Sequence, residues 1–518
     1  MNKKKINLSK TFCYRASAFN HIKFEDYKDT YHSKLDGFEF DKIHQTIYQN
    51  YIDIFYSKHD EVITKYFGLA SVKIILLISH LIYDELLFDD LKNSRIDYVL
   101  SNKIDTLKKS IINSHQDMLK QFNFNNLTLK KYKAYLKLIK NQRNFNLNFK
   151  SIFDGNNFIY IGKKNNIISS IYSDIDTKSI ILDNSFFYPI TKKIKIDKLL
   201  SNKIDNLFKR IMDTYHLSDN SFFKNKLIKI KKDLEFLYNF MLTAQKLTMD
   251  KRCRGFYVHA IGHPINRFIA AGLRLSKNEV ISDIHGNMDV TLRNSIARAI
   301  YGEFSICSRL IAKSYDEFKF ANEVVEKNLI VEDKSQVILH STSEINPKRY
   351  TKEIYRNDVI KNIMILGFPH KPTFTVGQPH LNSITQITFE MDLCNHLKSS
   401  GYKVFYKCHP DRIDEVRSVL KDKVDYFLTE KFEDCYSLCD CIFFTYASTT
   451  AFGFALGTEI PIVLFNFSTS DLNYENLTRI EKRCSISKLN FDKKGYDKIN
   501  INEINKLIVD AKNKILKN

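Results

Sequence analysis

Two short polar motifs in the last third of the chain carry residue types that bind phosphate. The first is His409-Pro410-Asp411-Arg412, which directly follows the apolar run VFYKC. An imidazole N–H can donate to a phosphate oxygen, and a guanidinium offers a planar fork that matches phosphate geometry. Pro410 stiffens the turn that orients the histidine. The motif predicts an anion site, but a histidine at this position is also common as a structural residue, and the His-Pro dipeptide occurs twice in the chain.

The second motif is Ser448-Thr449-Thr450, which follows the apolar run CIFFTYA and precedes the small-residue pattern AFGFALG. Hydroxyl groups and backbone N–H groups at a helix N-terminus form an anion site that the helix dipole strengthens. A plain helix N-cap explains the same residues equally well. Because the two motifs follow neighbouring predicted strands, each supports the other as part of one phosphate or nucleotide site.

A third candidate site lies in the sequence ISDIHGN near the middle of the chain. His285 is a candidate general base because imidazole accepts a proton near neutral pH. Asp283 either orients this histidine or is itself the base. Gly286 permits close approach of a substrate to the backbone, and Asn287 with Arg293 is predicted to hold an anionic substrate. A satisfied loop histidine is the alternative interpretation of His285.

A glycine follows the apolar run NIMIL at Gly367, in the sequence GFPH. It opens the last predicted sheet, at the place where a nucleotide-binding loop would face a ligand. An ordinary turn explains this glycine as well.

Residues 360–465 alternate short apolar strands with helical segments, which predicts βαβ units and a parallel sheet. In such sheets, ligands bind at the carboxyl ends of the strands. The predicted elements are, in chain order, a strand in NIMIL, a helix over Ser383–Ser400, strands over Lys403–Lys407 and Tyr426–Thr429, a helical turn over Phe432–Leu438, a strand over Cys441–Tyr446, the start of a helix at Phe452–Leu456 and a strand over Ile460–Phe465.

The rest of the chain predicts three parts. Residues 1–200 have helical periodicity with a small β-rich segment after residue 150, residues 201–350 have α/β character, and residues 351–518 form the second α/β domain with a closing helix over Ile504–Leu516. The most apolar segment, Ser71–Leu87, is short for a membrane span and carries charges, so it is predicted to be a buried helix.

Composition favours an anionic partner. The 518 residues include 79 basic and 59 acidic side chains, for a net charge of +20. A solvated lysine-rich surface is the alternative explanation. The nine cysteines lack paired zinc-site spacing and are predicted to be buried, reduced thiols. With no apolar stretch behind the basic N-terminus, the expected location is the cytoplasm, with peripheral contact at the inner face of the cytoplasmic membrane.

The order of the motifs resembles that of the GT-B glycosyltransferases of bacterial surface polysaccharide biosynthesis. The order is HG, then HP, then S-T-T before a small-residue helix and the strand EIPIVLF. It is similar to two groups: the CMP-sugar enzymes, including bacterial sialyltransferases and capsule Kdo transferases, and the CDP-glycerol or CDP-ribitol polymer transferases. The resemblance is strongest over residues 360–470 and fainter over 255–330, and residues 1–200 match neither group.

The resemblance implies an α/β, GT-B-like fold. Two Rossmann-like domains, an acceptor domain at 201–350 and a donor domain at 351–518, would face a cleft, with the helical N-terminal region added. It further implies that His409 holds the donor phosphate, while Ser448 and Thr449 bind the same phosphate or the cytidine ribose. The neighbouring donor-site residues would be Gly367, Pro410, Arg412 and Thr450. His285 or Asp283 would be the base.

The implied function is transfer of a sugar from a cytidine-activated donor to a surface glycan, glycolipid or glycoprotein. The donor would be a CMP-linked acidic sugar such as Kdo or a nonulosonic acid. No acidic-acidic-glycine motif, which the sialyltransferases use for their base, is clear in the first half, and this shifts weight toward Kdo-like or polyol-like relatives. No DxD-type metal motif stands out either, so no metal and no cofactor beyond the donor is expected.

Besides a different nucleotide-sugar enzyme of the same architecture, such as an epimerase, two alternatives stay open at this point. One is a transferase for CDP-glycerol or CDP-ribitol. The other, suggested by the charge, is a basic nucleic-acid-binding or scaffold protein, although the chain has neither a recognisable nucleic-acid module nor one concentrated basic run. Nucleic acid is therefore not the expected partner.

Overall fold

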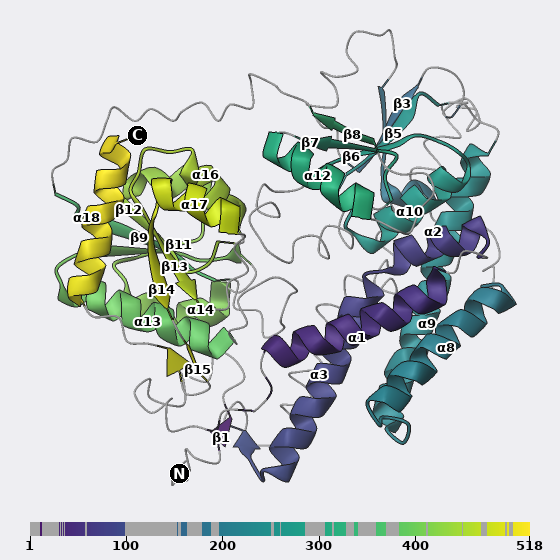
Figure 1. Cartoon of the computed structure of the whole chain (residues 1–518), viewed down its shortest axis with the longest axis horizontal. Coiled ribbons are helices and arrows are strands. Elements are labelled where there is room, and N and C mark those ends of the chain that lie inside the picture. The colour runs from purple at the N-terminus through teal and green to yellow at the C-terminus, as the bar shows by residue number, and fades with distance from the viewer. Residues whose placement is uncertain are drawn as a thin grey trace, which may run out of the picture.

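The structure is a computed structural model of the whole chain (Figure 1). It describes residues 11–12, 31, 33, 35, 37–56, 60–98, 153, 157–162, 179–187, 196–249, 253–259, 261–284, 306–312, 315–327, 336–339, 359–368, 383–410, 413–447, 449–467, 474–489, 491–492, 495–496 and 501–517.

The C-terminal part of the chain folds around a parallel sheet of six strands. The strands lie in the order β11-β10-β9-β12-β13-β14, so the chain winds first to one side of β9 and then to the other. This is the strand order of the classical dinucleotide-binding fold. The strands are β9 (Asn362–Leu366), β10 (Lys403–Lys407), β11 (Tyr426–Leu428), β12 (Cys441–Phe444), β13 (Ile462–Phe467) and β14 (Ser485–Leu489).

Helices cover both faces of this sheet, and each face has its own hydrophobic layer. The central strands are buried on both faces, which explains their near-continuous apolar sequences. Figure 1 shows α13 on one side and α16 with α17 on the other. The helices of this part are α13 (Ser383–Ser399), α14 (Ile413–Leu420), α15 (Phe432–Cys435), α16 (Thr450–Leu456), α17 (Tyr474–Arg483) and α18 (Ile501–Lys517), with short 3-10 turns η9 (Lys421–Lys423) and η10 (Tyr436–Leu438) and a small antiparallel pair β15 (Phe491–Asp492) and β16 (Gly495–Tyr496).

Another parallel sheet of six strands lies in the preceding part of the chain, in the order β4-β3-β5-β6-β7-β8. We call it the first sheet, because it comes first in the chain, and the sheet of β9 to β14 the second sheet. In the first sheet the direction of winding changes between β3 and β5, which is the other common doubly wound arrangement. The strands are β3 (Phe158–Ile161), β4 (Ser179–Leu182), β5 (Gly255–Val258), β6 (Val280–Asp283), β7 (Arg309–Ala312) and β8 (Gln336–Leu339). The predicted α/β class with two parallel, Rossmann-like sheets is therefore confirmed.

The first sheet begins earlier in the chain than the predicted domain boundary at residue 200. β3 and β4 precede that residue, and β3 pairs with β5 across about 90 intervening residues that include two helices. Sequence periodicity reports the type of a local element but not its distant partner, so the prediction placed these strands with the N-terminal region.

The N-terminal helices share one hydrophobic core with a face of the first sheet. Arg267, which is completely buried, donates from Nη2 to the carbonyl oxygen of Leu69 at 2.7 Å and so ties α10 to α2. The helices and short elements of this part are β1 (Thr11–Phe12), which pairs with β2 (Asp97–Tyr98), α1 (Gly37–Phe55), α2 (Val62–Ser71), α3 (Ile74–Asn93), η5 (Asn184–Phe187), α8 (Lys198–Thr214), α9 (Ser221–Thr248), α10 (Pro264–Leu275) and α12 (Tyr315–Lys327).

The apolar segment predicted as a buried helix spans the end of α2 and most of α3, and most of its side chains are buried. None of the described helices alone has the length and composition of a membrane span. Among the described helices, only α2 and α3 taken together have that length and composition, and the pair is bent by 51°.

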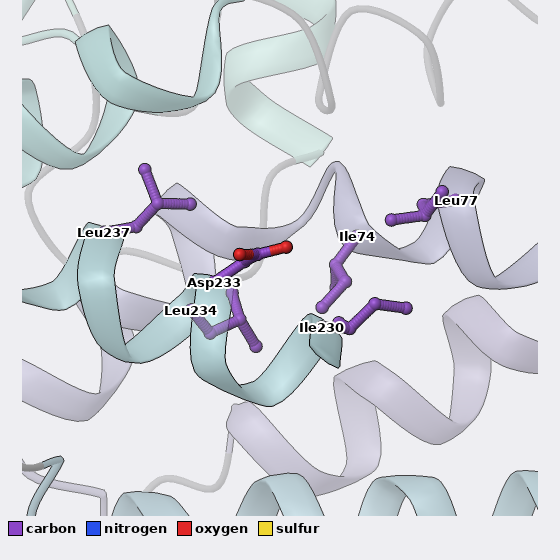
Figure 2. A pocket seen from close by; sticks show the side chains of 6 residues that line it. All are labelled: Ile74, Leu77, Ile230, Asp233, Leu234 and Leu237. Atoms are coloured by element: carbon purple, nitrogen blue, oxygen red, sulfur yellow. The ribbon is translucent and has the colours of Figure 1, made fainter. Parts of the chain in front are cut away.

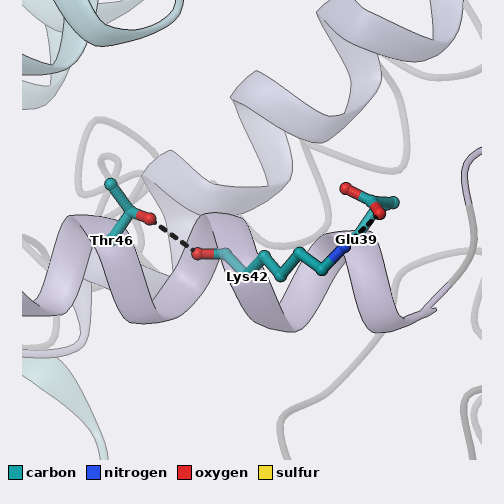
Figure 3. A network of polar contacts seen from close by, with 3 residues as sticks. All are labelled: Glu39, Lys42 and Thr46. Carbon is teal, nitrogen blue, oxygen red and sulfur yellow. Dashed lines mark hydrogen bonds and ion pairs between the residues drawn. The ribbon is translucent and has the colours of Figure 1, made fainter.

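The exposed side of α1 carries a small polar network (Figure 3). Lys42 donates from Nζ to Glu39 at 2.6 Å, and Thr46 donates to the carbonyl oxygen of Lys42 at 2.9 Å. Exposed pairs at this helical spacing contribute only about 0.3–0.5 kcal/mol. The network therefore adds only modestly to the stability of α1.

Between α3 and α9, one carboxylate lies in an apolar cavity of about 10 Å³ (Figure 2). Asp233 is surrounded there by five aliphatic side chains, and its Oδ2 has no hydrogen-bond partner in the structure as described. Burial raises the pKa of Asp233 to about 6, and Lys229 only partly opposes the rise. The ionised side chain therefore destabilises the folded state above pH 6.

Asp233→Asn is expected to raise the free energy of unfolding by about 2 kcal/mol at pH 8, because a shift of about two pKa units corresponds to about 3 kcal/mol and the amide keeps part of the burial cost. The gain should disappear as the pH falls from 6 to 4, where Asp233 is protonated in the folded state. Urea unfolding of the wild type and the variant at pH 8 and at pH 4 measures the difference in the free energy of unfolding. Asp205→Asn, at an exposed ion pair with Lys231, is the control. A gain that is equal at both pH values would contradict the interpretation.

Candidate functional site

The carboxyl ends of three adjacent strands in the second sheet carry the predicted phosphate-binding residues. In the register, Leu366 of β9 lies between Lys407 of β10 and Phe444 of β12. The winding direction reverses between β9 and β12, which is where doubly wound sheets bind ligands.

Gly367 and the described residues of the two motifs lie at this edge. Gly367 follows β9 and donates its N–H to the carbonyl oxygen of Lys407 at 3.1 Å. His409 lies two residues beyond β10 and is half-buried, with Pro410 exposed beside it. Thr449 and Thr450 form the start of α16, five and six residues beyond β12. The fold therefore brings all five to the carboxyl ends of three adjacent strands.

Thr449 is the N-cap of α16, and its hydroxyl oxygen accepts from the N–H of Ala451 at 3.3 Å. The structural interpretation of this motif is therefore correct for Thr449. The hydroxyl keeps its own hydrogen as a donor, since capping uses only a lone pair. Arg412 and Ser448 lie outside the described residues.

A buried carboxylate beneath this edge connects the three strands. Glu390 of α13 accepts hydrogen bonds from the N–H of Phe368 at 2.9 Å, from the hydroxyl of Thr445 at 2.8 Å and from the hydroxyl of Tyr406 at 2.6 Å. Burial, followed by the charge of Glu390, raises the pKa of Tyr406 well above 10, so the phenol remains a donor. We call these four residues the Glu390 cluster.

Each donor of the Glu390 cluster belongs to a different strand end: Phe368 follows β9, Tyr406 lies in β10 and Thr445 follows β12. Glu390 and its three partners are all buried. Because three donors satisfy one carboxylate, the cluster holds the strand ends in a fixed relation. The cluster cannot be predicted from the sequence, since a glutamate within a helix gives no local signal of burial.

Gly367 lies directly against this cluster. A Cβ at this position would lie 2.0 Å from the hydroxyl oxygen of Tyr406. The glycine is therefore required by the close approach of the backbone to a buried tyrosine, and the ordinary-turn explanation omits this constraint.

The first sheet also places polar residues at the carboxyl ends of its strands. Asp283 ends β6 and accepts a 2.5 Å hydrogen bond from the hydroxyl of Tyr257, a buried residue of β5. The predicted candidate base is thus oriented by a phenol of the neighbouring strand. His285, Gly286, Asn287 and Arg293 lie outside the described residues.

His259 was not singled out as a site residue, yet it lies at the point where the winding of the first sheet reverses. It follows β5, and its ring lies 6.5 Å from that of Tyr257. Gly162 follows the neighbouring strand β3 and has a φ of +95°. A Cβ at Gly162 would lie 3.4 Å from the Cβ of His259. The sequence signal for His259 is its position directly after the apolar strand FYV.

The described cysteines, Cys253 to Cys484, form no disulfide, and all but Cys253 are buried, as predicted for reduced thiols. No group of three or more His, Cys, Asp or Glu side chains is arranged to hold a metal ion in the part of the chain that the structure describes.

Comparison of the chain with protein-family models finds no match, and comparison with curated proteins finds no significant match. Function must therefore be inferred from the geometry of the two sheet edges.

Proposed function

We propose that this protein is a GT-B glycosyltransferase that uses a cytidine-activated donor, specifically a CMP-linked acidic sugar. One observation carries the proposal: Gly367, His409 and Thr449 lie at the carboxyl ends of adjacent parallel strands, at the point where the sheet reverses its winding. This is the position at which doubly wound sheets bind nucleotides.

The donor site would work through hydrogen-bond donors. The imidazole of His409 donates to a phosphate oxygen, and the hydroxyl of Thr449 donates to the phosphate or ribose. Gly367, where any side chain would clash with Tyr406, lets the backbone turn at the end of β9 beside the donor site. These interactions stabilise the negative charge of the leaving nucleotide without a metal ion.

The acceptor would be activated from the first sheet. Asp283 accepts the proton of the acceptor hydroxyl, and its bond from Tyr257 orients the carboxylate. In this proposal the acceptor is a surface glycan, glycolipid or glycoprotein. The net charge of +20 favours an acidic donor and peripheral contact with the anionic inner face of the cytoplasmic membrane.

His409→Ala tests the donor site. We expect the dissociation constant for CMP to rise about tenfold, because one hydrogen bond to a charged group contributes about 1.5–3 kcal/mol. Isothermal titration calorimetry measures the constant. His396→Ala is the matched control, since His396 lies in the last turn of α13, just before β10 begins at the opposite edge of the sheet. Unchanged CMP affinity in His409→Ala would contradict the assigned site.

A further inference from the structure

The end of β10 contains a buried cation. Lys407 is 8% exposed, and its Nζ donates to the carbonyl oxygen of Cys408 at 2.7 Å. Among the described residues this is its single hydrogen bond, and none of them forms an ion pair with it. An ammonium group has three donors, and buried charges are normally paired. Two of the donors of Lys407 therefore remain for another partner.

The register places Lys407 on the side of the sheet that α16 covers. Lys407 is in line with Leu366 and Phe444, and both of these belong to the hydrophobic layer that includes Phe452 of α16. The ammonium group bends toward the strand end, where it meets the carbonyl of Cys408. It thus lies at the same edge and on the same face as the start of α16.

Glu430, whose carboxylate senses the charge of Lys407, forms no ion pair with it. Backbone hydrogen bonds from Glu430 and Thr429 are the main reason that the pKa of Glu430 is lowered, and Lys407 contributes least. Burial raises the pKa of Cys435 to about 11, and the first charge that opposes this rise is Lys407. Cys435 therefore remains a neutral thiol near pH 7, and Glu430 is an exposed side chain.

We propose that Lys407 binds the phosphate group of the donor nucleotide. This inference rests on the proposed function and adds a cation to the same site. Its two remaining N–H groups would hold phosphate oxygens, supplementing His409 and the hydroxyl of Thr449.

The cation also suits the transfer step. The bond between the anomeric carbon and the phosphate oxygen breaks, and its electron pair stays on the phosphate. The acceptor oxygen bonds to the anomeric carbon, while its proton passes to the carboxylate of Asp283. The phosphate gains one negative charge in this step, so Lys407 binds the leaving CMP more strongly than the donor and favours bond breaking.

The test compares CMP with cytidine by isothermal titration calorimetry on full-length protein. Lys407→Met should weaken CMP binding at least about tenfold and change cytidine binding by less than about twofold, because cytidine lacks the phosphate. Lys403→Met is the matched control, since Lys403 lies on the same face at the opposite end of β10 and contacts the exposed ring of Tyr426. It should leave both affinities unchanged.

The possible results distinguish the role of Lys407 from the proposed function. A folded Lys407→Met that binds CMP as tightly as the wild type overturns the role of Lys407 and leaves the proposed function standing. The wild type could instead bind UDP or GDP and not CMP, and Lys407→Met could lose that binding. This result would support Lys407 as the cation that binds phosphate, and it would overturn the cytidine donor. A wild type that binds no nucleotide overturns both.

A second measurement on the wild type covers the case in which Lys407→Met does not fold. Reductive methylation followed by mass spectrometry should label Lys407 less in the presence of CMP than in the presence of cytidine. Equal labelling with the two ligands would overturn the proposal.

Discussion

Replacing Asp283 with asparagine is expected to lower the turnover number about 10²–10⁴-fold and to leave CMP affinity within about twofold of the wild type. A positioned general base contributes a rate factor of this size, and an amide cannot accept the proton of the acceptor hydroxyl. The hydrogen bond from Tyr257 should persist, because the amide oxygen still accepts it. Mass spectrometry of products from a CMP-sugar donor and a glycolipid acceptor, together with calorimetry of CMP binding, measures both quantities.

Asp183→Asn is the matched control, because Asp183 is an exposed carboxylate that follows β4 at the same edge of the first sheet. Its activity should equal that of the wild type. If Asp283→Asn retains more than about a tenth of the wild-type rate, Asp283 is not the base. His259→Ala would then be the next variant, since His259 lies on the adjacent strand β5.

The second large effect is expected at the Glu390 cluster. Glu390→Ala should lower the free energy of unfolding by about 4 kcal/mol, because three buried donors lose their acceptor and each unsatisfied group costs about 1–3 kcal/mol. The same variant should weaken CMP binding, since the strand ends that carry Gly367, His409 and Thr449 lose their common anchor. Urea unfolding and calorimetry measure the two effects.

Glu390→Gln separates the loss of the acceptor from the loss of volume. The amide oxygen keeps one acceptor, and the hydroxyl of Tyr406 can rotate to accept from the amide, so a loss of only about 1–2 kcal/mol is expected. A cost below about 1 kcal/mol for Glu390→Ala would show that the cluster does not hold the strands. An unchanged CMP affinity in a folded Glu390→Ala would show that the cluster does not position the site.

Sequence alone predicts the elements of the second sheet closely because their signals are local. The predicted strand at 403–407 matches β10 residue for residue, and the predicted helix at 383–400 differs from α13 by one residue. Both follow from apolar periodicity and from the alternation of strand and helix. The same alternation predicts parallel strands and therefore predicts that His409 and Thr449 lie at one edge of the sheet.

Interactions between distant residues could not be predicted in the same way. The three partners of Glu390 lie 16, 22 and 55 residues away, and Tyr257 lies 26 residues from Asp283. Neither pattern nor spacing marks such pairs. Lys407 was missed for a related reason: a lysine at the end of an apolar strand gives no sign of whether it is solvated or buried.

The most direct test of the proposed cytidine-donor site is a titration of the wild-type protein with CMP, CDP, UDP, GDP and ADP in the presence of EDTA, followed by thermal unfolding and calorimetry. We predict that CMP and CDP bind and raise the unfolding temperature, whereas UDP, GDP and ADP do neither. Binding of UDP or GDP alone would contradict the cytidine donor. Binding of none of the five would contradict the assignment of Gly367, His409 and Thr449 to a nucleotide site.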